Sequence, residues 1–417
     1  MMRRICCLTA ALLMCAGLQA QKLPLKELPP LHACVHTDKA ELAFPGSREA
    51  HDAFLTKLDS LRDGTRSNLN IWHIGGSHVQ AGHFSYRIME DLTSMAPDMK
   101  GERGFIFPMR LAHTNSDKSF RTSSEGYWEC PMMTRNSEYE KPRYGITGFG
   151  ATTSDSTARV SFGLGINADS TWTFNRLRVM GYPSAGGSAH PYLIAGSDTL
   201  SYTGDWHPES YIFDLPAETD SVDIYFNIPS GETFTLTGFE PISGRRGISY
   251  YASGVNGARV RNWLDDAEDL ERDLPLVDPD LCIFGLGIND SACKAEDFSP
   301  ERFKDNYREL IAMIRRQSPD CTFIFITNND SYRYVRRGMA YNTNARAVQK
   351  AMYELAREFD GAVFDQFAIM GGANTVLTWR DCGLIKADKL HFTREGYILM
   401  ADLLYNAIIQ DYNDGLE

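Results

Sequence analysis

The chain has 417 residues, which is more than one hydrophobic core usually serves, so we expect two domains. Its formal net charge is −12, with 42 Lys and Arg against 54 Asp and Glu, and the basic residues form no dense block. This charge pattern argues against nucleic acid and against anionic membrane surfaces as partners. A neutral or cationic ligand remains open.

The first twenty residues read MMRRICCLTAALLMCAGLQA. Arg3 and Arg4 form a short positive end, an apolar run follows, and the small residue Ala20 closes the segment. This layout predicts a secretory signal peptide, which is too short for a spanning helix. Lipid attachment at Cys15 is the alternative, but Met14 stands where a small residue is needed, so we favour cleavage after Ala20.

Removal of this segment takes two arginines away and changes the net charge from −12 to −14. We therefore expect a secreted or periplasmic protein. No later stretch offers about 18 consecutive apolar residues, so we expect no membrane span.

Six cysteines follow the signal segment, and their spacing matches no zinc pattern. They are also too sparse for a disulfide scaffold. Cys282 and Cys321 stand in strand-like apolar runs, which indicates buried small side chains. One or two disulfides fit an oxidising compartment, and the spacing leaves their pairing open.

The chain alternates strand-like and helix-like segments at both ends. Residues 68–74 read as a strand, Gly75 and Gly76 break it, and residues 79–95 have helical spacing. After about residue 245 the alternation returns, with strands expected at 281–284, 322–327 and 362–364 and helices beginning at 299–301, at 342 and after Thr393. Such alternation predicts a parallel sheet with helices on both faces.

The middle of the chain has another pattern. Residues 155–242 contain short alternating runs such as ARVSFGL, SYIFDL and SVDIYFNI, separated at intervals of about ten residues by Gly, Pro, Asp and Ser. This pattern predicts an antiparallel β-sandwich. We therefore expect an α/β domain in two segments, 21–150 and 245–417, split by an inserted β-sandwich at 151–244. The stretch 96–154 has no clear assignment and is expected to be a surface excursion near the site.

Three motifs follow predicted strands. In Gly75-Gly76-Ser77-His78 the serine begins a helix, where backbone N–H groups favour negative charge. In GLGIND, Asn289 can aim its amide at a developing oxyanion, and in YASGVNGA, Gly254 can offer its N–H. Each motif has a plainer alternative: a helix cap at Ser77, and ordinary turns at the other two.

A fourth motif, Asp388-Lys389-Leu390-His391, lies just before the last predicted helix. A carboxylate three residues before an imidazole can orient it, leaving the other ring nitrogen free to face a nucleophile. Lone Asp and His residues are usually surface residues, so the spacing alone is a weak signal.

The order of these motifs resembles the SGNH hydrolases, also called GDSL-like esterases. The resemblance implies a flavodoxin-like, three-layer α/β fold with Ser77, Gly254, Asn289 and His391 as marker residues. It implies that Ser77 attacks an acyl carbonyl, that His391 moves the proton, and that Asp388 orients His391. The N–H groups of Ser77 and Gly254, with the Asn289 side chain, would form the oxyanion hole.

Two features qualify this assignment. The family usually has Asp just before the serine, where this chain has Gly76, so substrate positioning is expected to differ. His78 is a rival base, but adjacent residues rarely present side chains to each other, so we prefer His391. We assign His78 and Trp379 to substrate contacts, and packing is the alternative for Trp379.

The β-rich insertion, together with Gly-x-Ser-His and GISYYASGVNGA, resembles secreted peptidoglycan O-acetylesterases. The resemblance implies a serine esterase that removes O-acetyl groups from a glycan, without metal or organic cofactor. A lipase, thioesterase or acyltransferase of the same fold is one alternative, and a catalytically disabled glycan-binding protein is another. The sugar and the oligomeric state are left open. Exposed-sugar candidates in the insertion, each with core packing as its alternative, are Trp172, Tyr192, Tyr202, Trp206 and Tyr211.

Overall fold

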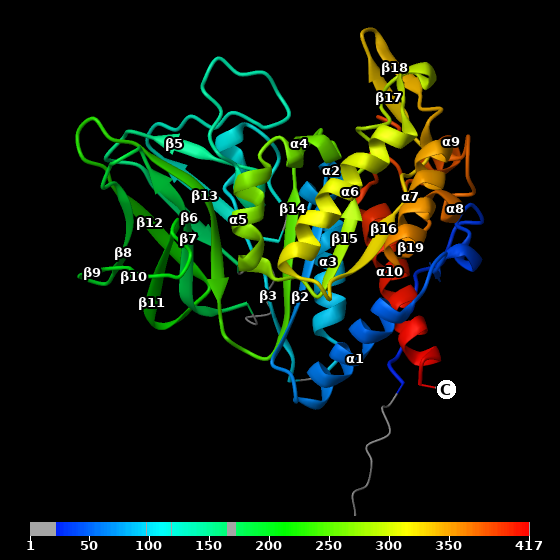
Figure 1. Ribbon diagram of the computed structural model, residues 1–417, viewed down its shortest axis with the longest axis horizontal. Coiled ribbons are helices and arrows are strands. Elements are labelled where there is room, and N and C mark those ends of the chain that lie inside the picture. Colours follow the sequence, from blue (N-terminus) through cyan, green and yellow to red (C-terminus); the bar gives the residue numbers. More distant parts are fainter. Residues whose placement is uncertain (1–21, 97, 118, 165–171, 417) are drawn as a thin grey trace, which may run out of the picture.

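The computed structural model describes residues 22–96, 98–117, 119–164 and 172–416, so the predicted signal peptide lies outside the described residues. A seven-stranded sheet has the order β1-β19-β16-β15-β2-β14-β3. Every neighbouring pair is parallel except β1 with β19, which confirms the predicted parallel sheet (Figure 1). The strands are β1 (Leu42–Ala43), β2 (Asn68–Gly75), β3 (Lys100–Glu102), β14 (Gly247–Gly254), β15 (Leu281–Gly285), β16 (Thr322–Ile326) and β19 (Ala362–Phe364).

Helices cover both faces of this sheet. One face carries α1 (Glu49–Asp63), α3 (His83–Thr93) and α10 (Arg394–Asp414), and the other carries α4 (Val260–Leu264), α5 (Ala267–Val277), α6 (Pro300–Gln317) and α7 (Ala345–Phe359). Successive strand side chains point to opposite faces. Ile283 therefore packs with the first set, whereas its neighbours Cys282 and Phe284 pack with the second. The result is the expected three-layer α/β fold.

The predicted helix boundaries mostly hold. The Ser299 hydroxyl accepts a hydrogen bond from the N–H of Arg302 at the start of α6, and Thr393 caps α10 in the same way. The expected single helix at 79–95 is instead two helices, α2 (Ser77–Gln80) and α3. Gly82 separates them because its φ of 76° is left-handed, a conformation that ends a helix and that glycine adopts without strain.

Shorter helices complete the α/β part. They are α8 (Gln366–Ile369), α9 (Val376–Asp381) and the 3₁₀ turns η1 (Thr37–Lys39), η2 (Met109–Ala112), η3 (Gly145–Thr147) and η4 (Ala295–Asp297). A hairpin of β17 (Tyr332–Val335) and β18 (Gly338–Tyr341) projects from the upper edge in Figure 1. No helix in the described ranges is long and apolar enough to cross a bilayer.

The inserted region is a sandwich of two five-stranded antiparallel sheets, ordered β10-β11-β7-β13-β5 and β4-β6-β12-β8-β9. The strands are β4 (Arg121–Glu125), β5 (Ala151–Thr153), β6 (Arg159–Gly163), β7 (Phe174–Pro183), β8 (His190–Ala195), β9 (Asp198–Leu200), β10 (Thr203–Gly204), β11 (Ser210–Thr219), β12 (Ser221–Asn227) and β13 (Phe234–Ile242). Strand β4 precedes the boundary expected at residue 151. Its sequence RTSSE is almost wholly exposed, so it carries no apolar alternation by which a strand is recognised.

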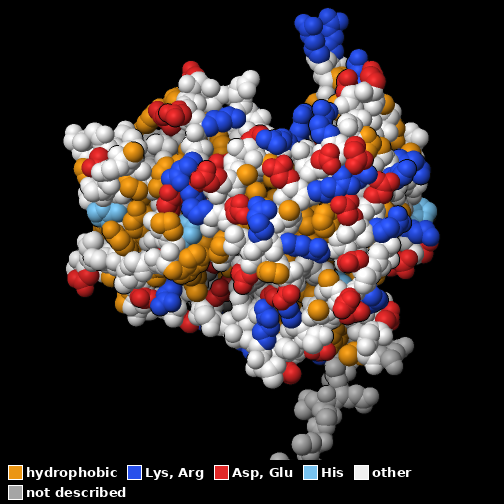
Figure 2. Space-filling view, in the orientation of Figure 1, with side chains coloured by type: hydrophobic (Ala, Val, Ile, Leu, Met, Phe, Trp, Pro, Cys, Tyr) orange, Lys and Arg blue, Asp and Glu red, His pale blue; other side chains and the backbone are white. Residues whose placement is uncertain are grey.

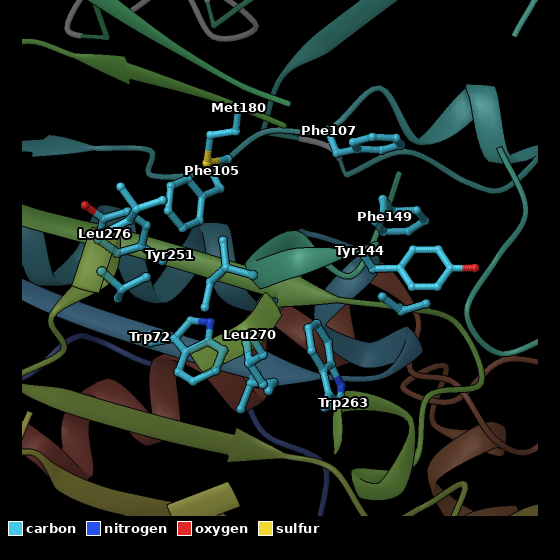
Figure 3. Close-up of a cluster of buried hydrophobic side chains, with 14 of the residues drawn as sticks. Trp72, Phe105, Phe107, Tyr144, Phe149, Met180, Tyr251, Trp263, Leu270 and Leu276 are labelled. Carbon is cyan, nitrogen blue, oxygen red and sulfur yellow. The ribbon is translucent and has the colours of Figure 1, made fainter. Parts of the chain in front are cut away.

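One apolar core runs from the sandwich into the α/β domain. Figure 3 shows Met180, Phe105 and Phe149 in the same cluster as Trp263 and Tyr251. Met180 comes from β7 of the sandwich, whereas Trp263 comes from α4 and Tyr251 from β14. Because the two parts share this core, we expect the sandwich to hold a fixed position against the sheet.

The six cysteines are free thiols in this structure. Cys282 and Cys321 are buried, as predicted from their apolar surroundings. The Sγ atoms of Cys34 and Cys382 lie 3.3 Å apart.

Removing the indole at the shared core should destabilise the protein. Trp263 is 1% exposed, and its ring packs against the backbone at Gly148. We expect Trp263→Ala to lower the free energy of unfolding by about 3–5 kcal/mol, measured by urea denaturation. Leu377→Ala, at a side chain 37% exposed, is the matched control and should cost far less. Equal losses in the two variants would contradict the shared core.

Candidate active site

Three strands end in glycine at the same edge of the sheet. Gly75 of β2 pairs with Gly254 of β14 on one side and with Gly285 of β15 on the other. A Cβ at Gly254 would lie 2.3 Å from the backbone nitrogen of Gln80, and a Cβ at Gly75 would lie 2.3 Å from Val79. Helix α2 can therefore sit directly on this row of glycines, and Ser77 is its first residue.

The predicted serine, histidine and aspartate are in contact, in the predicted order. His391 Nε2 lies 2.8 Å from Ser77 Oγ, and His391 Nδ1 lies 2.8 Å from Asp388 Oδ2. The other carboxylate oxygen, Oδ1, accepts hydrogen bonds from the N–H groups of Leu390 (2.9 Å) and His391 (3.0 Å). Ser77 comes from one end of the chain and the other two residues from the other end, so the fold brings them together.

The carboxylate of Asp388 is held in its charged form. Burial alone would raise its pKa, but hydrogen bonds from the His391 ring and from the N–H groups of His391 and Leu390 outweigh burial and set the pKa well below its ordinary value. A carboxylate that stays ionised can fix the ring tautomer and stabilise the imidazolium that forms when the ring takes a proton.

Asn289 lies on the loop after β15, beside Ser77. Its Nδ2 donates to the carbonyl oxygen of Ala258 at 3.0 Å, and a Cβ at Gly76 would lie 3.0 Å from this nitrogen. Glycine at position 76, where the family usually has aspartate, therefore leaves this amide uncrowded.

Gly254 does not occupy the position expected of it. It is the last residue of β14, it is buried, and it does not line the cavity at Ser77. Gly257, three residues later, lines that cavity, is exposed and has a left-handed φ of 82°. No described residue accepts a hydrogen bond from its N–H. The motif YASGVNGA contains both glycines, and only the course of the loop decides between them.

A cavity of about 600 Å³ opens above Ser77. Its walls come from segments far apart in the sequence and include Ser77, Gly257, Asn289 and His391, with Arg135, Tyr334, Lys386 and Tyr397 around them. Arg135, Tyr334, Lys386 and Tyr397 were not foreseen as site residues, because each is a single residue in a loop, strand or helix without a recognisable motif. Among the described residues no group of His, Cys, Asp and Glu is placed to hold a metal ion.

A polar network fixes the 96–154 stretch beside the site. The Gln80 amide donates to Thr114 Oγ1 (3.0 Å) and to the carbonyl oxygen of Asn115 (2.7 Å), and it accepts from the N–H of Asn256 (2.6 Å). The Asn256 side chain in turn donates to Thr114 and Asn115. Helix α2, the Gly257 loop and this stretch therefore hold each other in place.

His78 and Trp379 do not take the substrate contacts expected of them. His78 Nδ1 lies 2.9 Å from the Tyr397 hydroxyl, and its ring packs 5.5 Å from that of His391. Burial, aided by the nearby His391 ring, lowers the pKa of His78 to about 3, so this ring is neutral. Trp379 is fully buried, and its Nε1 donates to the carbonyl oxygens of Cys34 and Met370. Trp379 is a packing residue.

The aromatic candidates of the insertion also lie outside this cavity, which is lined by other residues. Trp172 packs partly buried against the core, Tyr192 stacks on Tyr225 at 5.4 Å, and Tyr211 lies edge-on to Tyr202 at 4.9 Å. Trp206 is 63% exposed on the sandwich.

The buried histidines predict a pH dependence of stability. Burial lowers the pKa of His73, whose Nδ1 lies 2.8 Å from the Tyr250 hydroxyl, to about 3. Below pH 6.5, the ordinary pKa of histidine, the unfolded chain binds a proton at this residue. The folded chain does not bind it until the pH approaches 3, so stability falls as the pH falls through this range. The loss is about 1.4 kcal/mol per pH unit for each such histidine.

Burial raises the pKa of Asp290 to about 7, so this group makes stability rise as the pH falls and opposes the effect of the histidines. The effect of His73 alone is therefore measured by comparing a variant with the native protein. We expect His73→Asn to reduce the slope of unfolding free energy against pH by about 1.4 kcal/mol per unit between pH 6 and 4.5, measured by urea denaturation. Parallel curves for the two proteins would contradict a neutral His73.

Comparisons with known proteins give a family match over part of the chain and a likeness in fold. Residues 237–399 match the GDSL-like Lipase/Acylhydrolase family. A solved structure described as a peptidoglycan O-acetylesterase aligns over 89% of this chain and 99% of its own, with 19% identity and a TM-score of 0.71. The acetylxylan esterase Axe2 from Geobacillus stearothermophilus aligns over 39% of this chain and 73% of its own, with 18% identity and a TM-score of 0.31. No curated protein sequence matches the chain.

The sequence match is confined to residues 237–399, whereas the likeness in fold extends over most of the chain. The chain is therefore similar to the GDSL-like Lipase/Acylhydrolase family over residues 237–399, and its overall fold resembles that of a peptidoglycan O-acetylesterase.

Proposed function

We propose that this ester hydrolase is a secreted serine esterase that removes O-acetyl groups from a glycan. The observation that carries the proposal is the line of contacts from Ser77 through His391 to Asp388. Nucleophile, base and orienting acid within hydrogen-bond reach are the arrangement that acyl transfer needs.

The reaction follows from these contacts. Ser77 Oγ attacks the acetyl carbonyl carbon while His391 Nε2 takes the hydroxyl proton, and Asp388 stabilises the charged ring. The tetrahedral intermediate collapses, His391 returns the proton to the sugar oxygen, and the sugar leaves as an alcohol. Water, deprotonated by His391, then attacks the acetyl carbon on Ser77; the bond to Ser77 Oγ breaks, acetate leaves, and His391 returns the proton to Ser77 Oγ.

Three donors are available for the oxyanion. Ser77 is the first residue of α2, so its N–H has no acceptor within the helix. The N–H of Gly257 and the side chain of Asn289 line the same cavity. We assign the glycine donor to Gly257 in place of Gly254, because Gly254 is buried under α2.

The cavity supports a short acyl group on a polar carrier. Most of its lining residues carry polar groups, Asn115, Thr134 and Asn256 among them, and its only aliphatic lining residues in the described part of the chain are Ala81 and Leu390. A lipase needs an extended apolar groove for a long acyl chain. The fold of the peptidoglycan O-acetylesterase, which spans nearly the whole of this chain, supports the same choice of substrate.

The first test is acetate release from a panel of O-acetylated glycans. We expect Ser77→Ala to lower the rate by about 10³-fold or more, because among the described residues Ser77 alone places a hydroxyl or thiol at His391 Nε2. Ser197→Ala, at an exposed serine on the sandwich, should leave the rate unchanged. Retained release by Ser77→Ala, or faster cleavage of octanoyl than of acetyl esters, would overturn the proposal.

The second test concerns the oxyanion. We expect Asn289→Ala to lower kcat by about 10²–10³-fold with little change in KM, because the amide is needed most in the transition state. Asn289 also bonds to Ala258, so thermal unfolding of the variant should be recorded beside its kinetics. An unchanged kcat in a folded variant would remove Asn289 from the oxyanion site.

A further inference from the structure

The cavity above Ser77 has a charge opposite to that of the chain. The sequence carries a net charge of −12, yet the cavity lining contains Arg135 and Lys386 and no Asp or Glu. Both cations are exposed, and neither forms an ion pair with any described residue. Most other arginines of the fold are paired, as Arg103 is with Asp117 and Arg87 with Asp402. These two charges therefore have no structural counterpart.

An exposed aromatic ring stands in the same wall. Tyr334 lines the cavity from the β17–β18 hairpin, and it is 64% exposed. The turn of this hairpin carries Arg336 and Arg337, both exposed. Figure 2 shows Lys and Arg side chains at the end of the projection that Figure 1 labels β17 and β18.

The hairpin is anchored to the loop that carries Asp388 and His391. The N–H of Tyr332 donates to the carbonyl oxygen of Lys389 at 2.8 Å, and Lys389 Nζ lies 4.7 Å from the centre of the Tyr332 ring. Tyr334 and the arginines of the turn are thus positioned relative to the catalytic residues.

We infer that the glycan bound at this site is acidic, carrying carboxylates near the acetylated hydroxyl. The inference rests on the proposed esterase function and names its substrate class. Tyr334 offers an apolar face to a sugar ring, while Arg135 and Lys386 bind carboxylates, which pair with guanidinium and ammonium groups by charge-assisted hydrogen bonds. Arg336 and Arg337 extend the positive field outward and attract the substrate. The net charge of the chain left a neutral or cationic ligand open. The charge of the ligand is set instead by the electric field at the cavity, which Arg135 and Lys386 make positive.

The test compares three O-acetylated substrates of similar length. Oligo-uronides carry the carboxylate on the ring, peptidoglycan fragments carry it on attached groups, and xylo-oligosaccharides carry none. We expect kcat/KM to be higher for at least one acidic substrate than for the neutral one. Arg135→Gln and Lys386→Gln should each lower the acidic-to-neutral ratio of kcat/KM by about ten-fold, and added salt should lower it in the native protein.

Lys350→Gln provides the matched control, because Lys350 is 80% exposed on α7 and should leave the ratio unchanged. A native preference for the neutral substrate, or a ratio that neither Arg135→Gln nor Lys386→Gln changes, overturns the acidic-glycan inference. Ser77-dependent release from the neutral substrate would in that case leave the esterase function standing. No Ser77-dependent release from any of the three overturns the proposed function and the inference with it.

Discussion

The close approach of α2 to the sheet is the constraint on which the site depends. Gly75, Gly254 and Gly285 lie side by side at the ends of three neighbouring strands. Without side chains there, the backbone of α2 rests on the strand ends and carries the hydroxyl of Ser77 to within 2.8 Å of His391, 314 residues later. A side chain at Gly75 or Gly254 would lift the helix. Because an imidazole accepts a proton only within hydrogen-bond reach, a shift of an ångström would separate the two groups.

Two aspartates near this edge of the sheet differ in charge because they accept different numbers of hydrogen bonds. Asp388 accepts two backbone N–H groups and one from the His391 ring, so its pKa is low in spite of partial burial. Asp290, in the loop after β15, accepts from the N–H of Val260 at 3.2 Å, and burial raises its pKa to about 7. The first can support a positive imidazole. Asp290 accepts the N–H of Val260, the first residue of α4, and so has a structural role. This difference fits a mechanism in which Asp388 is the one carboxylate used.

The sandwich contributes to the site through the chain segments that it holds. After β3 the chain leaves the sheet and adds β4 and β5 to the two sheets of the sandwich. Asn115, before β4, and Arg135, between β4 and β5, reach the cavity. The shared core of Phe105, Phe149 and Trp263 fixes this arrangement. The exposed aromatic residues of the sandwich, such as Trp206, lie elsewhere. The insertion therefore contributes to the site by positioning residues of the cavity wall, and its exposed aromatic residues form no part of that wall.

The sequence by itself determined the alternating elements, the helix starts at Ser299 and Thr393, and the serine, histidine and aspartate that meet, because each rests on a local pattern or on an ordered set of motifs. Only the tertiary structure decided between Gly254 and Gly257, buried the indole of Trp379, added β4 to the sandwich and gathered unpaired cations around the serine. These outcomes depend on which segments lie against each other in space. The local sequence around a turn, a lone tryptophan or a single lysine does not show whether the residue faces a core or a cavity. Its environment is determined by packing between segments that are distant in the sequence.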